Sequence, residues 1–169
     1  RNNPLNYRPI SLLRNLSKFF ERVVHKEMLN FLDDNKLLNS NNSGFKKGDS
    51  ATNQLTHIIH KIETGLDKKF NTLMVFLDIK AAFDSVWHAG LIYKLECVGI
   101  SGILLNWVKN YLADRNQRVV IKGSSSMLLP ISAGVPQGSI LGPLLFLIFI
   151  NDFGHNLSSD SSLFADDSS

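Results

Sequence analysis

Residues 72–86 read TLMVFLDIKAAFDSV, and the spacing of apolar residues changes here from helical to strand-like. The first six residues form a short apolar run with β-branched members, which is typical of a central strand covered on both faces. The run stops at Asp78, a charged residue that is costly to bury unless a partner or a cation compensates it. The stretch therefore predicts a buried strand with a carboxylate at its end.

Helical and strand-like patterns surround this stretch on both sides. Apolar residues at helical spacing, with Ser11 and Ser50 as possible N-caps and Gly65 near a helix end, predict helices over 11–32, 50–66, 89–98, 102–112 and 140–153. A hairpin is expected over about 117–132, and a short strand over 163–165. Strands mixed with helices predict an α/β or α+β fold, in which helices pack on at least one face of a sheet.

Composition limits the class of protein. The chain has 169 residues, of which 44% are hydrophobic and 20% charged, with one cysteine, so a disordered chain, collagen and a disulfide scaffold are excluded. The longest apolar run, 144–150, is far below the roughly 20 residues of a membrane span. Because the sequence begins with Arg1 and has no signal-peptide core, we expect a part of a longer polypeptide. The lone Cys97 cannot pair within the chain, so a reducing compartment is expected.

Charge is unevenly distributed along the chain. Residues 1–70 carry 12 Lys and Arg against 7 Asp and Glu, whereas residues 123–169 contain 4 acidic residues and no Lys or Arg. This asymmetry indicates one surface for a polyanion and another for cations, although many soluble domains without a nucleic-acid partner show the same imbalance.

Three carboxylates follow the two predicted strands, Asp78 after the first and the pair Asp166 and Asp167 after the second. If these strands are neighbours in one sheet, the carboxylates converge, and hard divalent cations would relieve their repulsion. The pair alone carries little information, because Asp33 and Asp34 form another Asp pair at an expected solvated helix end.

Five segments in order resemble the conserved motifs of reverse transcriptases, closest to the non-LTR, jockey-like retrotransposons. DIKAAFDSV (78–86), GVPQGSILGP (134–143) and FADD (164–167) resemble the three central motifs, while YRPISLL (7–13) and GFKKGDS (44–50) are similar to fingers motifs. The resemblance implies the right-hand polymerase fold, with fingers over 1–70 and palm over 71–169. It also implies that the strand completing the catalytic hairpin, the primer grip and the thumb are absent.

The resemblance implies which residues bind metal. Asp78, Asp166 and Asp167 would be the catalytic carboxylates and would hold two Mg²⁺ or Mn²⁺ ions, with Asp166 the stronger ligand of the pair. The backbone carbonyl of Ile79 would help to hold the ion on the nucleotide side. Two such ions activate the attacking oxygen and steady the leaving oxygen.

The resemblance also implies contacts to the substrates. The ring of Phe83 would crowd the sugar 2′ position and exclude ribonucleotides, and Gln137 and Gly138 would lie against the incoming nucleotide. Arg8 and Lys46 would neutralise phosphate charge near the triphosphate or the template.

A few neighbouring residues have weaker implications. Lys47 is a weaker candidate for a nucleic-acid contact, and Asp84 is expected to position a loop and not to bind metal. The family commonly has Gln where Ser43 stands and Arg where Lys46 stands, so the triphosphate geometry would be looser.

The function implied is RNA-directed DNA polymerisation, with an RNA template, a DNA primer and deoxynucleoside triphosphates (dNTPs) as partners and no membrane. A missing thumb and an endonuclease module would lie elsewhere in the parent polypeptide, which would act in nucleus and cytoplasm. The alternative is an inactive nucleic-acid-binding relic, which would bind RNA in a salt-sensitive way without incorporating nucleotides.

Overall fold

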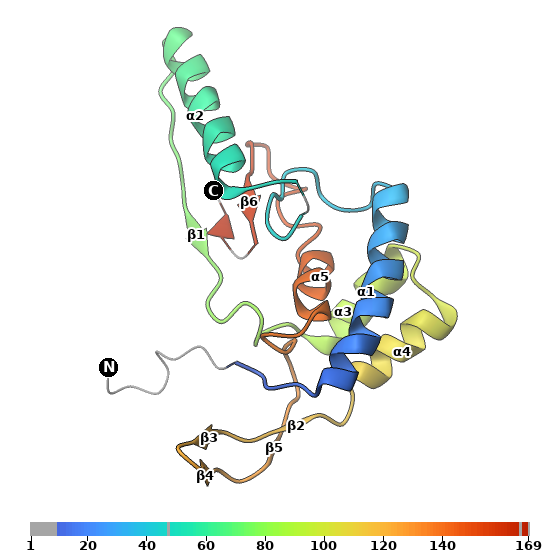
Figure 1. The fold of residues 1–169 in the computed structure, drawn as a ribbon. Coiled ribbons are helices and arrows are strands. Elements are labelled where there is room, and N and C mark those ends of the chain that lie inside the picture. Colours follow the sequence, from blue (N-terminus) through green and yellow to red (C-terminus); the bar gives the residue numbers. More distant parts are fainter. Residues whose placement is uncertain (1–9, 47, 166, 169) are drawn as a thin grey trace.

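The computed structural model describes residues 10–46, 48–165 and 167–168, which fold into helices and short strands (Figure 1). The helices are α1 (Asn15–Asp34), α2 (Ala51–Asp67), α3 (His88–Cys97), α4 (Gly102–Leu112) and α5 (Leu141–Phe149). The strands are β1 (Leu77–Asp78), β2 (Asn116–Gln117), β3 (Val120–Ile121), β4 (Ser124–Ser125), β5 (Leu129–Pro130), β6 (Leu163–Phe164) and β7 (Asp167–Ser168). The α+β class predicted from the sequence is confirmed.

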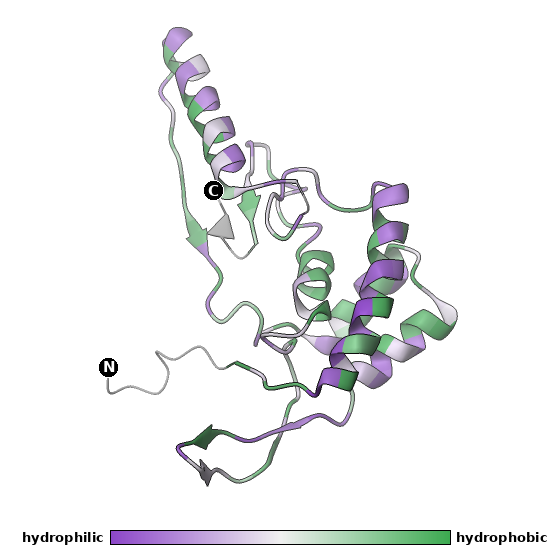
Figure 2. Cartoon of the chain, viewed as in Figure 1, coloured by the Kyte–Doolittle hydropathy of each residue, from purple (hydrophilic) through white to green (hydrophobic). Residues whose placement is uncertain are grey.

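The core forms around α5, which is apolar on nearly every side (Figure 2). Helices α1, α3 and α4 gather around one side of α5, whereas the small sheet of β1, β7 and β6 lies on its other side (Figure 1). Met28 and Leu32 of α1 lie in the same apolar cluster as Leu91 of α3, Val108 of α4 and Phe146 of α5. This core also includes Val135, so it anchors the loop before α5. In the part of the chain that the structure describes, no helix has both the length and the hydropathy needed to cross a bilayer.

Helix α2 stands away from this core, and none of its side chains is buried. Its predicted N-cap is confirmed, because the Ser50 hydroxyl accepts a hydrogen bond from the Asn53 N–H at 3.2 Å. The helix ends at Asp67, two residues beyond the glycine expected near its end. A salt bridge of 3.2 Å between Lys61 and Asp160 joins α2 to the loop before β6.

The start of α1 differs from the prediction. The helix begins at Asn15, and its N-cap is Arg14, which makes no side-chain cap, so Ser11 is not the cap. The Ser11 N–H donates instead to the carbonyl of Gln137 at 2.8 Å, which holds this segment in an extended path. One stripe of α1, spaced at three and four residues, is exposed although it is apolar: Leu16, Phe19, Phe20 and Val23.

The predicted central strand over 72–77 is largely wrong. Only Leu77 and Asp78 form β1, and most of the preceding residues are exposed, Leu73 by 89% and Phe76 by 75%. Pairing decides this outcome, because β1 pairs with β7, and both strands are two residues long. Residues 72–75 line a cavity of about 340 Å³ together with Ile58 and Ile62 of α2.

The two predicted hairpins have different outcomes. The expected hairpin over about 117–132 is present as two short antiparallel pairs, β2 with β5 and β3 with β4. The strand expected to be missing after the Asp pair begins in the structure as β7, which pairs with both β6 and β1. Helix α5 is shorter than the predicted helix over 140–153. It ends at Phe149, and the chain then turns.

Burial of Tyr111 on α4 makes stability depend on pH in the alkaline range. Its hydroxyl is buried and has no hydrogen-bond partner among the described residues, and burial raises the pKa of Tyr111 to about 12. The folded-state pKa of Tyr111 lies above its unfolded value. The contribution of the neutral Tyr111 side chain to stability is therefore complete below about pH 10 and is lost as pH rises towards 12.

We expect Tyr111→Phe to reduce this alkaline loss by about 2 kcal/mol and to leave stability at pH 7 unchanged or about 1 kcal/mol higher. Urea unfolding of both proteins between pH 7 and 12 measures the difference. An equal alkaline loss in the two proteins would contradict the assignment.

Candidate functional site

The two predicted carboxylate strands belong to one sheet, but they are not direct neighbours in it. Strand β7 lies between β1 and β6, and both pairs are antiparallel. Asp78 is directly opposite Asp167 in the register, and Phe164 is opposite Asp167 on the other side. The backbone positions of Asp78 and Asp167 therefore come together through β7, and not through direct pairing of the two predicted strands. Asp166, which comes between β6 and β7 in the sequence, lies outside the described residues.

Asp78 has the surroundings of a cation ligand. Its side chain is exposed at the end of β1, and none of the salt bridges among the described residues involves it. Carboxylate and carbonyl oxygens are the ligands that Mg²⁺ and Mn²⁺ prefer, so Asp78 and the carbonyl of the following Ile79 fit a divalent ion. The described side chains do not by themselves form a three-ligand cluster, and Asp78 is the one predicted carboxylate whose side chain is among them.

A segment from the N-terminal part of the chain lies parallel to β6. Asn42 forms a parallel bridge with Leu163, whose N–H donates to the carbonyl of Asn41 at 2.9 Å. The Ser43 N–H donates to the carbonyl of Leu163, also at 2.9 Å. The segment 41–44, which ends at the first residue of the GFKKGDS motif, therefore extends the sheet at the edge formed by β6.

The same segment contacts the residue just before the Asp pair. Asn42 is buried, and its side-chain oxygen accepts from the N–H of Gly44 at 2.9 Å and from the N–H of Ala165 at 3.4 Å. Gly44 packs so closely that a Cβ there would lie 2.1 Å from the Ala165 nitrogen. Ala165 itself has a φ of 57°, a conformation that alanine rarely adopts, so these contacts hold a strained turn in place.

Sequence reasoning missed Asn42. A signal was present, because an Asn two residues before a Gly can hydrogen-bond its own backbone in an Asx-turn. The long-range contact with Ala165 had no local signature.

Phe83 lies between the core and the surface. Its half-buried ring stacks on Phe146 of α5, with ring centres 5.0 Å apart and planes at 19°. Phe45 of the GFKKGDS motif contacts the ring edge-on, with centres 5.9 Å apart and planes at 89°. The rotation of Phe83 is thus restricted from two sides, as a ring that shapes a neighbouring site requires.

The segments 83–86 and 134–135 are joined by backbone hydrogen bonds. The Val135 N–H donates to Phe83 and the Gly134 N–H donates to Val86, both at 2.8 Å. The close approach requires glycine, because Gly134 has a φ of 92° and a Cβ there would lie 2.7 Å from the Asp84 carbonyl oxygen.

Gln137 is held from two directions. Its side-chain Nε2 donates to both carboxylate oxygens of Asp84 at 3.2 Å, which confirms the expectation that Asp84 positions a loop. Its backbone carbonyl accepts from Ser11, as described above, and Gly138 lies beside Ile10 and Ser11. Three motif segments, at 10–11, 83–86 and 134–138, therefore meet at one place.

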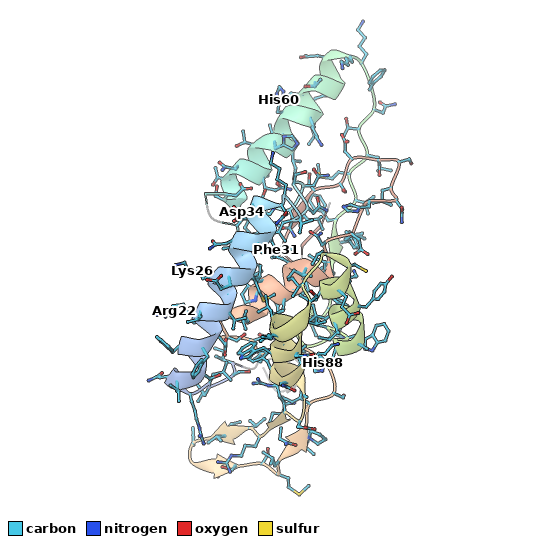
Figure 3. The ribbon with its side chains drawn as sticks, turned by 90° about the vertical axis from the view of Figure 1, so that its right-hand side faces the viewer. Arg22, Lys26, Phe31, Asp34, His60 and His88 are labelled. Carbon is cyan, nitrogen blue, oxygen red and sulfur yellow. The ribbon has the colours of Figure 1, made fainter. Side chains whose placement is uncertain are left out.

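The basic residues are brought together only in part. The ammonium group of Lys46 donates to the backbone carbonyl of Asn39, and burial lowers the pKa of Lys46, although Asp49 and Asp33 act against this shift. Arg8 and Lys47 lie outside the described residues. On α1, Arg22 and Lys26 are exposed one turn apart (Figure 3).

The chain is similar to known proteins over most of its length. The family described as reverse transcriptase (RNA-dependent DNA polymerase) matches residues 1–168. In Drosophila melanogaster, the probable RNA-directed DNA polymerase from transposon BS is 38% identical over 89% of this chain, and that from transposon X-element is 36% identical over 88%. The RNA-directed DNA polymerase from mobile element jockey is 37% identical over 87%. The chain spans 16% of the length of each of these three relatives.

The matches extend over both ends of the arrangement described above, from the segment at 10–11 to strand β7. The resemblance to jockey-like retrotransposon polymerases is thereby confirmed, and the chain belongs to the reverse transcriptase (RNA-dependent DNA polymerase) family.

Proposed function

We propose that this chain carries the catalytic centre of an RNA-directed DNA polymerase, which extends a DNA primer on an RNA template with dNTPs. The observation that supports this most is the register of β1 and β7, which sets Asp78 opposite Asp167. The chain segment that leaves β1 contains Phe83. Backbone hydrogen bonds join the loop at 134–138 to this same segment. Carboxylates that can hold divalent ions are what nucleotidyl transfer needs.

Enzymes of this family generally depend on divalent metal, and the oxygen ligands present fit that requirement. In our proposal Asp78, Asp166, Asp167 and the carbonyl of Ile79 hold two Mg²⁺ or Mn²⁺ ions. When bound, these ions activate the primer 3′-oxygen and stabilise charge on the departing pyrophosphate. The protein's own contribution is to hold the carboxylates at fixed backbone positions, opposite each other across β1 and β7.

The proposed nucleotide contacts come from Phe83, Gln137, Gly138, Arg8 and Lys46, with Lys47 touching nucleic acid. The bonds from Asp84 and Ser11 support this for Gln137, since they restrict the loop before any ligand binds. The bond from Lys46 to Asn39 means that Lys46 has to leave a protein partner to reach a phosphate.

We further propose that residues 1–70 act as fingers and 71–169 as palm. In this proposal the thumb and an endonuclease module are other parts of the parent polypeptide. The parent polypeptide acts in the nucleus and the cytoplasm. Helix α1 shares its core with the proposed palm, so the two regions are expected to move little relative to each other along this helix.

Primer extension tests the proposed function. The polypeptide that contains this chain is incubated with a DNA primer, dNTPs and Mg²⁺ on an rA template and, in a parallel reaction, on a dC template, and primer extension is followed. Extension that stops on chelation and returns with Mg²⁺ supports the proposal. Salt-sensitive RNA binding without extension would instead identify a nucleic-acid-binding relic.

Phe83→Val tests the proposed sugar selectivity. We expect incorporation of ribonucleotides relative to deoxyribonucleotides to rise on the order of 10- to 100-fold, because a smaller side chain leaves room for a 2′-hydroxyl. The measurement is the ratio of kcat/KM for a ribonucleotide and its deoxyribonucleotide on one template. Phe31→Val on α1 serves as the control and should leave this ratio unchanged. An unchanged ratio in Phe83→Val would show that Phe83 does not contact the sugar of the incoming nucleotide.

A further inference from the structure

Glu21 is a fully buried carboxylate in the middle of α1, with 0% exposure. Its Oε2 accepts from the N–H groups of Ile140 at 2.8 Å and Leu141 at 3.3 Å, and its Oε1 accepts from the Ser17 hydroxyl at 3.2 Å. None of the salt bridges among the described residues involves Glu21. The carboxylate is therefore compensated by hydrogen-bond donors, of which two are backbone groups of another part of the chain.

These two donors are at the start of α5. The first N–H groups of a helix have no intrahelical partner and carry partial positive charge, which normally favours an acceptor at the N-cap. The N-cap of α5 is Ile140, whose side chain has no acceptor. Glu21, which is 119 residues away from Ile140 in sequence, supplies the missing acceptor.

The residues directly before this helix form the loop proposed to contact the nucleotide. The Ser139 N–H and hydroxyl donate to the carbonyl of Pro136 at 3.1 and 2.7 Å, and the Ser139 hydroxyl accepts from the Gly142 N–H at 2.8 Å. Residues 136–139 therefore form a tight turn that continues directly into α5. Asp84 and Ser11 restrain this turn at Gln137, and Glu21 restrains its other end.

We propose that Glu21 is a positioning residue that fixes the loop 134–139 through the first N–H groups of α5, and so sets its affinity for the incoming nucleotide. This proposal rests on the proposed function for the role of the loop. The geometry also couples α1 to the loop, because a displacement of α1 would remove the acceptor from the α5 start.

Glu21→Gln tests the proposal, since it keeps the shape of the side chain and removes its charge. Glu27→Gln, one exposed position on the same helix, is the matched control. Amide hydrogen exchange in the polypeptide that contains this chain is the first readout. We expect protection to fall about tenfold at Ile140 and Leu141, and also at Ser139 and Val135 in the loop. If protection from exchange falls at Ile140 and Leu141 alone, the proposal is overturned, because Glu21 would then only cap a helix.

Kinetics supply the second readout. We expect KM for the dNTP to rise about tenfold in Glu21→Gln while kcat changes less than threefold, and Glu21→Asp to recover part of the loss. A fall in kcat with unchanged KM would overturn the proposal. If Glu21→Gln does not fold, Glu21→Asp carries the same two measurements. If the unaltered polypeptide incorporates no nucleotide, the proposed function fails, and hydrogen exchange still decides whether Glu21 holds the loop.

Discussion

Replacing Asp78 with Asn is expected to reduce nucleotide incorporation by about a thousand-fold or more, with little change in stability. Removing the charge weakens the proposed hold on both metal ions, and electrostatic groups of this kind each contribute on the order of 10²- to 10³-fold or more. Asp78 is exposed and takes part in none of the described salt bridges, so folding does not depend on its charge. Primer extension on an RNA template measures the first effect, and thermal unfolding measures the second.

Asp34→Asn is the matched control for this change. Asp34 is an exposed carboxylate at the last position of α1 and belongs to the second Asp pair of the sequence. Its replacement should leave both incorporation and unfolding unchanged. Incorporation that survives in Asp78→Asn would show that the metal is held elsewhere, whatever the family membership of the chain.

The helices could be predicted well because their signal is local. The apolar spacing of residues 102–112 gives the bounds of α4, and Ser50 caps α2 as its position before the periodic stretch indicates. Errors are confined to ends, such as the start of α1 at Asn15, where the backbone of Ser11 is taken by Gln137. A local pattern contains no information about such a long-range bond.

The strand over 72–77 shows the opposite case. Its composition is that of a buried strand, yet a strand exists only where a partner pairs with it. β7 pairs with Leu77 and Asp78 and leaves the earlier residues exposed. Sequence alone could predict where the strand ends and where its carboxylate lies, but not how far the pairing extends.

The candidate site could be predicted only in part, because some of its residues lie in recognisable local motifs and others act through distant partners. Motif resemblance located Asp78, Phe83 and Gln137, because each lies within a recognisable local sequence. Asn42 and Glu21 act through partners more than 100 residues away, and their roles appear only once the chain is folded. For Glu21 a signal existed, since a glutamate seven residues before Met28 lies on the core-facing side of the helix.

Gly44→Ala is expected to have the second largest effect, because it acts on Ala165, the residue directly before the proposed metal ligands Asp166 and Asp167. A Cβ at this position would lie 2.1 Å from the nitrogen and 2.7 Å from the Cα of Ala165. Both atoms belong to the backbone, so the clash cannot be relieved by a side-chain rotation, and β6 or the segment 41–44 has to shift. We expect a loss of stability of about 1–3 kcal/mol from this overpacking.

Incorporation should fall further than stability, by about 100-fold, because a shift of about 1 Å in a catalytic group costs this much. Gly65→Ala in α2 is the matched control: the contact there is the rotatable Thr72 hydroxyl at 2.9 Å, and alanine favours a helix. That variant should keep full incorporation and equal or slightly higher stability. If Gly44→Ala loses stability while its remaining folded fraction polymerises at the normal rate, the contact between segment 41–44 and Ala165 serves folding alone. If incorporation falls in the folded protein, segment 41–44, which leads into the motif similar to a fingers motif, also positions Ala165 for the proposed site, since Asn42 and Gly44 are its contacts with Ala165.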